Sequence, residues 1–317
     1  LQACRSSARA HQVLTALAAG GLLYAAYGLF EALGSETGVV TSTFVNRNSY
    51  ATYAGITLFC GLGLALGELQ RRGRAGASFR DVALAVLGRL DARFALGAVA
   101  CLVAGTALLL TQSRGGFVAL CAALAAFVWS LRQSALIAPA ASLKATAVLT
   151  LGLTLGLVWL AGEQTLGRFA TDAQAIHRLA YYRATWEAIA DRPLLGTGYG
   201  TYPDAFKAYN RPETGTYFLD KAHNTYLQVI MELGWPAAAA LYGGLALLVV
   251  RSVRSRPGCS VLVAVHSLVD FSLEMPANAA TFALLLGAGC AQALRDGGPS
   301  ADRRRARSPA PGSENPG

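Results

Sequence analysis

Four polar side chains lie close together in residues 221–236, which read KAHNTYLQVIMELGWP: His223, Asn224, Gln228 and Glu232. We expect His223 and Asn224 to open a helix, with Glu232 about two and a half turns deeper. The apolar run that follows predicts a membrane span, where polar groups are costly unless they serve a site. An imidazole titrates near neutral pH, so His223 could act as a general base. Its structural alternative is a helix-end histidine that only bonds backbone groups.

Arg114 is the second residue with obvious chemistry, because it lies in the run TQSRGG at 111–116 between two apolar stretches. A hydroxyl, a guanidinium and flexible backbone N–H groups together suit a phosphate or diphosphate, which arginine contacts bidentately. Arg47, between two asparagines at 46 and 48, could serve the same anion. It could equally be an anchor at the membrane interface.

A long hydrophilic segment carries two further arginines, Arg178 and Arg183, in a stretch with Tyr and Trp that predicts an amphipathic helix ending near Asp191. The two arginines predict a groove for an anionic lipid head group at the membrane surface. A solvated helix face with aromatic residues in the interfacial belt explains the same pattern. The run GTGYG at 196–200 is not a nucleotide loop, since no strand precedes it and no Lys-Ser/Thr follows. We predict a turn between helices there.

His266 and Asp270 are four residues apart, a spacing that predicts a buried pair on one helical face. We assign them a structural role. The six cysteines form no CxxC pair and the four histidines have no metal-ligand spacing. The sequence therefore predicts no metal site and no cofactor.

The composition identifies the elements that must position these residues. Hydrophobic residues make up 54% of the chain and charged residues only 14%, which indicates an integral membrane protein. We expect an all-α, polytopic membrane bundle of about eight transmembrane helices with one large periplasmic loop that contains short helices. Apolar runs long enough to cross the bilayer lie at 13–33, 49–69, 94–111, 115–131, 143–161, 225–250 and 277–294, with a doubtful one at 258–271.

Lys and Arg gather at the cytoplasmic ends of membrane spans, and about two thirds of the 27 basic residues fall on one side in the eight-span register. Both termini are then cytoplasmic, and the +9 net charge reflects topology rather than nucleic-acid binding. Four polar clusters fall on the opposite face: residues 44–51, residues 111–116, the large loop with the helix that follows His223, and residues 266–279. Sequence-distant motifs that converge on one face predict a single extracytoplasmic site.

This register divides the chain into four parts: N-terminal transmembrane helices at 1–161, the large periplasmic loop at 162–222, C-terminal transmembrane helices at 223–295 and a disordered cytoplasmic tail at 296–317. The chain begins without Met, so we expect it to lack spans at its N-terminus. The run around 258–271 is short for a crossing, so we expect a shortening or a re-entrant segment there.

The joint order of the motifs resembles the O-antigen ligase and polymerase superfamily of bacterial inner-membrane glycosyltransferases. The resemblance runs from about residue 43 to 287 and is carried by NRN, SRGG, RATWEAIADRPLLGTGYG, HNTYLQVIMELG and HSLVDFSLEMPANA. It implies a periplasmic active site, a donor glycan linked to a polyprenyl diphosphate such as undecaprenyl diphosphate, and no essential metal. Members usually have around ten to twelve spans, so the shorter chain puts its own activity in question.

The motifs and the resemblance together predict a glycosyltransferase of lipopolysaccharide biosynthesis in which His223 is catalytic. Arg114, Arg183, Arg47, Arg178 and Asn224 are the expected substrate-binding residues. The acceptor could be lipid A core, a growing polysaccharide repeat or a protein hydroxyl. A flippase that binds the same lipid-linked glycan without reacting is the alternative from another class, and a non-catalytic scaffold is a third. The partners in each case are membrane lipids and a lipid-linked glycan, without nucleic acid.

Overall fold

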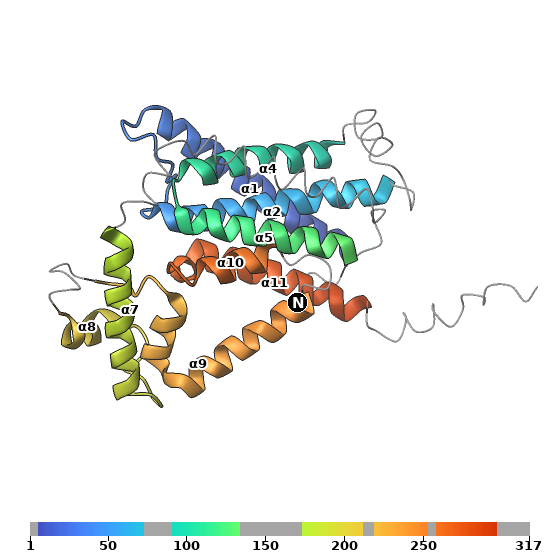
Figure 1. Cartoon of the computed structure of the whole chain (residues 1–317). Helices are drawn as coiled ribbons and strands as arrows, with labels where there is room; N and C mark the ends of the chain where they lie inside the picture. The colour runs from blue at the N-terminus through green and yellow to red at the C-terminus, as the bar shows by residue number, and fades with distance from the viewer. Residues whose placement is uncertain (1–5, 73–90, 134–172, 212–218, 253–257, 297–317) are drawn as a thin grey trace, which may run out of the picture.

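The computed structural model describes residues 6–72, 91–133, 173–211, 219–252 and 258–296 (Figure 1). Within these ranges the chain folds as α-helices with two short 3-10 helices and contains no strand. The all-α prediction is confirmed for this part of the chain. The expected span at 143–161 and the expected tail lie outside the described residues.

Five of the described helices are long and apolar enough to cross a membrane. They are α1 (Ser7–Leu33), α2 (Arg47–Arg72), α4 (Ala92–Leu110), α9 (Thr225–Ser252) and α11 (Pro276–Asp296). A further apolar helix, α5 (Arg114–Gln133), is slightly shorter in its apolar part. The chain is therefore a multi-pass membrane protein, and each of these six helices overlaps an expected span.

The doubtful run at 258–271 forms only a short helix, α10 (Gly258–His266), of nine residues. Nine residues rise about 14 Å, roughly half of the hydrocarbon thickness. As a single helix α10 cannot cross the bilayer. The count of eight spans consequently stays a prediction.

The bundle is built around α2, which packs against α1, α4, α5, α10 and α11. Glycines allow the closest approach: a Cβ on Gly61 of α2 would lie 2.6 Å from the carbonyl oxygen of Gly97 of α4. Small residues at such crossings let two helix backbones pack directly in a membrane. In Figure 1 helices α1, α2, α4 and α5 lie together, with α10 and α11 beside them and α9 running obliquely below.

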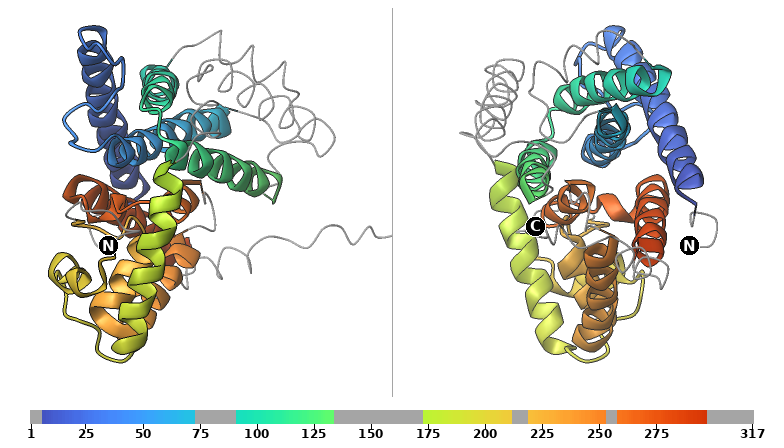
Figure 2. Two further views of the ribbon diagram at one scale, coloured as in Figure 1. Left: turned by 60° about the vertical axis from the view of Figure 1, so that its left-hand side comes forward. Right: turned by 90° about the vertical axis from the view of Figure 1, so that its right-hand side faces the viewer.

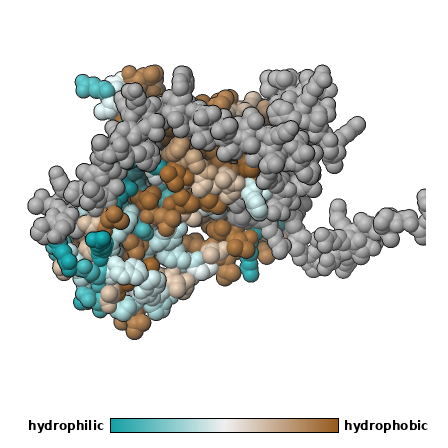
Figure 3. All heavy atoms as spheres, in the orientation of Figure 1, coloured by the Kyte–Doolittle hydropathy of each residue, from teal (hydrophilic) through white to brown (hydrophobic). Residues whose placement is uncertain are grey.

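A second group of helices lies at one end of these helices (Figure 1). Helix α7 (Ala173–Asp191) runs across the other helices: in the right-hand view of Figure 2, α2 and α5 are seen nearly end-on whereas α7 is seen along its length. Together with α8 (Tyr202–Phe206) and the 3-10 helix η2 (Lys207–Tyr209), it packs on the first part of α9 around a separate small core. Hydrophilic residues gather at this α7–α8 end of the molecule (Figure 3).

Helix α9 is broken at Gly234, whose φ of 73° and ψ of 168° are not helical. The loop after α7 occupies the break: the N–H groups of Thr197 and Gly198 donate to the carbonyls of Met231 and Glu232 at 2.9 and 2.8 Å. A Cβ on Gly234 would lie 2.2 Å from the carbonyl oxygen of Leu194, so only glycine fits there. The GTGYG run is thus a turn between helices, as predicted, and it caps a broken helix.

Candidate functional site

His223 and Asn224 lie at the start of α9, but neither is in the helix. Asn224 is its N-cap, with Oδ1 accepting from the N–H of Leu227 at 3.1 Å. His223 precedes the cap and has a φ of +51°, a left-handed conformation that is uncommon outside glycine. The expected helix start is correct to within one turn.

Two aromatic residues lie against His223. The hydroxyl of Tyr182 donates to the His223 carbonyl at 2.9 Å, and the ring meets Phe271 edge-on with centroids 5.2 Å apart. Within the described residues, Nδ1 is buried and has no hydrogen-bond partner. Burial lowers the pKa of His223 below its ordinary value and the Arg178 charge lowers it further, while Asp220 acts in the opposite direction. The imidazole is therefore neutral at neutral pH and can accept a proton.

Arg178 is the arginine that the structure places beside His223. From α7, its Nη1 donates to the carbonyl of Val269 at 3.1 Å. Its positive charge acts on both His223 and Asp270. A cation held beside a neutral imidazole suits a reaction in which a base takes a proton while negative charge develops nearby.

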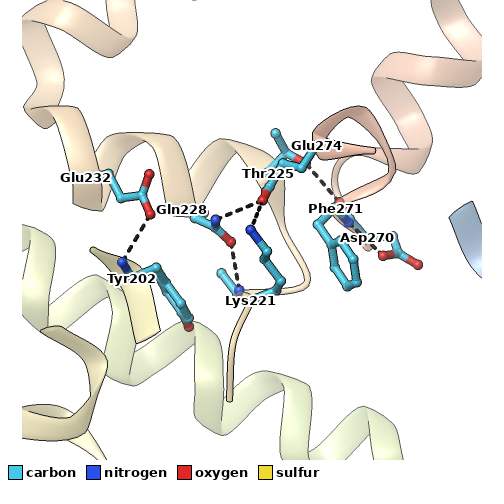
Figure 4. A network of polar contacts seen from close by, with 9 residues as sticks. Tyr202, Lys221, Thr225, Gln228, Glu232, Asp270, Phe271 and Glu274 are labelled. Carbon is cyan, nitrogen blue, oxygen red and sulfur yellow. Dashed lines mark hydrogen bonds and ion pairs between the residues drawn. The ribbon is translucent and has the colours of Figure 1, made fainter. Parts of the chain in front are cut away.

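The segment from Ser267 to Asn278 holds these groups in place. Its backbone accepts two hydrogen bonds from the first residue of α9, because Thr225 donates its N–H to Ser267 and its hydroxyl to Asp270, each at 3.0 Å. The N–H of Phe271 donates to the Asp270 carboxylate at 2.7 Å (Figure 4). Burial raises the pKa of Asp270, whereas the Phe271 N–H, Arg178 and Asn48 favour its charged form. This segment thereby connects α9, α7 and α2.

The expected pair of His266 and Asp270 on one helical face is wrong. Helix α10 ends at His266, so the two residues are not one turn apart on a helix. The buried His266 instead hydrogen-bonds through Nδ1 to the hydroxyl of Thr52 on α2 and to that of Ser272, the latter at 3.3 Å. Asn278 donates to the carbonyls of Ser49 and Ser272 at 2.9 Å each. His266 thus joins α10 to α2, and Asn278 joins α11 to α2.

The start of α5, where Arg114 lies, packs against the same segment. Ser113 caps this helix, its Oγ accepting from the Gly116 N–H at 3.1 Å. A Cβ on Gly115 would lie 2.7 Å from Val269 and 3.1 Å from the His266 ring. The partly buried Arg114 therefore begins a helix beside the residue whose carbonyl binds Arg178. The sequence prediction that these motifs converge is supported by this geometry.

Arg47 lies between two asparagines, one of which acts on Asp270. It is the first residue of α2 and is partly buried. Asn46 accepts from the Asn48 N–H at 2.8 Å, and the Asn48 side chain acts on the Asp270 carboxylate. The NRN motif thus lies at the edge of the site, with the Asn48 side chain directed at Asp270.

Arg183 is separated from this group. It is exposed, and five residues place it about 140° around α7 from Arg178. The geometry brings His223, Asn224, Arg178 and the start of α5 together and leaves Arg183 on another face. The two arginines that the sequence grouped do not flank one groove.

Gln228 and Glu232 also have a role that the sequence did not predict. Both are buried at 4% and 3% exposure. Gln228 accepts from the Ala222 N–H and donates to Glu274, each at 3.0 Å, and Glu232 accepts from the Tyr202 N–H at 3.1 Å (Figure 4). Gln228 thus holds the backbone one residue before His223, whereas Glu232 holds the start of α8.

An ion pair completes that support. Lys221 binds the Glu274 carboxylate that also accepts from Gln228. Burial raises the pKa of Glu274, and Lys221 opposes this by favouring the charged form. A sequence signal for the pair was absent, because its members lie 53 residues apart. Among the described residues, no three His, Cys, Asp or Glu side chains form a group that could hold a metal ion.

Residues 99–242 match the family model described as O-antigen ligase. No curated protein and no solved structure matches the chain. The matched range contains Arg114, Arg178, His223 and Asn224, and it ends within α9, before the supporting segment that begins at Ser267.

Proposed function

We propose that this chain, which its residues 99–242 identify as a member of the O-antigen ligase family, is a glycosyltransferase that acts on lipid-linked glycans. The donor is a glycan on a polyprenyl diphosphate, and the acceptor is a hydroxyl group, with lipid A core as the first choice. The reaction takes place at the periplasmic face of a bacterial inner membrane. The family and the candidate spans support an enzyme that works within a membrane.

One observation carries the proposal: a neutral histidine with a buried, unpartnered ring nitrogen lies beside a fixed guanidinium at a helix N-terminus. Buried polar atoms are nearly always hydrogen-bonded in proteins, so an unpartnered imidazole nitrogen points to a substrate group. A hydroxyl can fill this place as a proton donor.

The reaction then balances as follows. Nδ1 of His223 accepts the acceptor hydroxyl proton while that oxygen forms a bond to the anomeric carbon of the sugar. The bond from this carbon to the diphosphate oxygen breaks, and its electron pair leaves with the polyprenyl diphosphate. The proton held by His223 is released to water afterwards. No nucleotide and no oxidant or reductant is consumed.

The arginines stabilise the leaving diphosphate. Arg178 binds the Val269 carbonyl, Arg114 precedes Gly115, which packs on Val269, and Arg47 lies at the edge of the same region. Because these cations are placed before the reaction, they stabilise the developing charge without rearranging. Removing one such contact typically lowers the rate by about 10²–10³. Asn224 contributes by fixing the helix start that presents His223.

The test is transfer of a defined lipid-linked oligosaccharide by the purified protein in detergent, with lipid A core, a second donor molecule and a peptide offered as separate acceptors. The key variant is His223→Asn, because asparagine tolerates the left-handed backbone at this position better than alanine. His11→Asn, on α1 and far from the site along the chain, is the matched control.

Transfer to one acceptor that disappears in His223→Asn and persists in His11→Asn supports the proposal and identifies the acceptor class. A second donor as the acceptor would indicate a polymerase, and a peptide would indicate protein glycosylation. Donor binding without transfer to any acceptor would contradict the proposal and favour a transporter of the same lipid. Unchanged transfer by His223→Asn would show that His223 is not the general base.

A further inference from the structure

Helix α7 has an exposed face that the proposed reaction does not use. Leu179, Arg183 and Trp186 follow one another at helical spacing and are all exposed, with Leu179 at 60% and Trp186 at 53%. Fully hydrated apolar side chains of this size are unfavourable, at about 25 cal/mol per Å² of apolar surface. A face of this kind in a membrane protein needs an explanation.

The exposed face continues beyond the helix. Leu194 and Leu195, at 68% and 86% exposure, project from the loop that caps the break in α9. Trp186 meets Trp235 edge-on, with ring centroids 6.0 Å apart, and Trp235 follows the break at Gly234 directly. In Figure 3 hydrophobic residues form the lower tip of the molecule, below α7 and α9. The apolar residues of α7 are thus continuous with the part of α9 that is apolar enough to cross a membrane.

We propose that this outer stripe, defined as Leu179, Arg183, Trp186, Leu194, Leu195 and Trp235, rests on the phospholipid leaflet at the α7 end of the molecule. Helix α7 then lies in the plane of the interface, with its leucines and tryptophans among the upper acyl chains. Arg183 binds phosphate groups of anionic lipids.

Three features favour lipid over other occupants. Tryptophan is typical of the membrane–water interface, and an arginine beside exposed leucines is typical of a helix lying on it. Cationic side chains next to the surface are attracted to anionic lipids. Leu194 and Leu195 have no flat ring for a sugar to stack on. A soluble partner would have to cover residues that are continuous with a span, which is already in lipid.

The lipid contact also sets the depth in the membrane at which the other face of α7 lies. If the outer stripe lies at the head groups, Arg178 lies at the depth where the diphosphate of a lipid-linked donor is found. This second step rests on the proposed function. The lipid contact of the outer stripe does not, so it is measured independently of transfer.

The measurement is quenching of tryptophan fluorescence by lipids brominated near the ester end of their acyl chains, with the full chain reconstituted in vesicles. The chain has four tryptophans, and replacing Trp129, Trp159 and Trp235 by Phe leaves Trp186 as the reporter. The control replaces all four by Phe and adds Ala208→Trp, at an exposed position on η2.

We expect brominated lipid to quench Trp186 several-fold more than the Ala208→Trp reporter, and aqueous iodide to show the reverse order. In the Trp186 background, Leu194→Ser with Leu195→Ser should reduce quenching by lipid, and Arg183→Glu should reduce it in anionic vesicles only. If iodide quenches Trp186 as strongly as the control reporter and brominated lipid does not, the proposal is wrong. Protection of Trp186 only on adding soluble oligosaccharide would overturn it in favour of a sugar platform. Either result stands whether or not the protein transfers glycan.

Discussion

The two faces of α7 carry similar residues and differ in what lies opposite them. Arg178 and Tyr182 face the supporting segment and the start of α9, where they contact the carbonyls of Val269 and His223. Arg183 and Trp186, only a few residues further on, are exposed. An arginine is thus held against a backbone carbonyl on one face and exposed on the other. The partner segment, which is distant in sequence, decides between the two roles.

The largest expected difference is in transfer rate between Arg178→Gln and Arg183→Gln. The first should lower kcat/KM by about 10²–10³, because it removes a fixed cation from the leaving group. The second should change transfer in detergent by less than about threefold, as expected of an exposed arginine. Initial rates with defined donor measure both. Equal losses would mean that both faces of α7 contact the donor, which would contradict the different roles assigned to Arg178 and Arg183.

A smaller effect is expected in the pH dependence of kcat/KM. His223 must be neutral to accept a proton, and burial together with Arg178 holds its pKa below 6.5. Transfer should therefore rise as pH increases through that lowered pKa and become level above it. Without the Arg178 charge the pKa of His223 increases, so the acidic limb of the residual activity of Arg178→Gln should move to higher pH.

Arg183→Gln is the control for this profile, since its side chain is not among the charges that shift the His223 pKa. Its acidic limb should coincide with that of the unmodified protein. A limb that does not move in Arg178→Gln would show that a group other than His223 titrates.

The smallest expected effect is that of Tyr182→Phe, on the face of α7 that carries Arg178. It removes one hydrogen bond to the His223 carbonyl, which is worth about 0.5–1.5 kcal/mol, so transfer should fall by about two- to tenfold. Leu179→Ala, on the outer face, is the paired control and should leave transfer in detergent unchanged. A larger loss in Leu179→Ala than in Tyr182→Phe would reverse the assignment of the two faces.

Helix positions and membrane character could be predicted from the sequence because a long apolar run has few structural interpretations other than a membrane-spanning helix. His223, Asn224 and Arg114 are candidates because each stands at the boundary of such a run. Residues 266–279 were expected at the same face, but the contacts of the supporting segment from Ser267 to Asn278 could not be predicted. Its contacts to Arg178 and Thr225 run through backbone carbonyls, which leave no mark on residue type.

The same reason explains the errors. Gln228 and Glu232 suggested a site because polar groups in an apolar helix usually serve one. Their partners are backbone N–H groups of Ala222 and Tyr202. Arg178 and Arg183 were grouped because sequence distance does not show helix register around a neighbour that comes later in the chain.

The capped break in α9 also limits how this protein can be altered. Surface loops commonly accept inserted residues at little energetic cost. The loop after α7 cannot, because Trp235 donates its N–H to the Pro193 carbonyl at 2.8 Å while Thr197 and Gly198 bind the other side of the break. One added residue between Pro193 and Gly198 would disrupt these hydrogen bonds. Epitope tags and fusion partners therefore belong elsewhere in the chain, and the length of this loop is as much a part of the fold as the helices it joins.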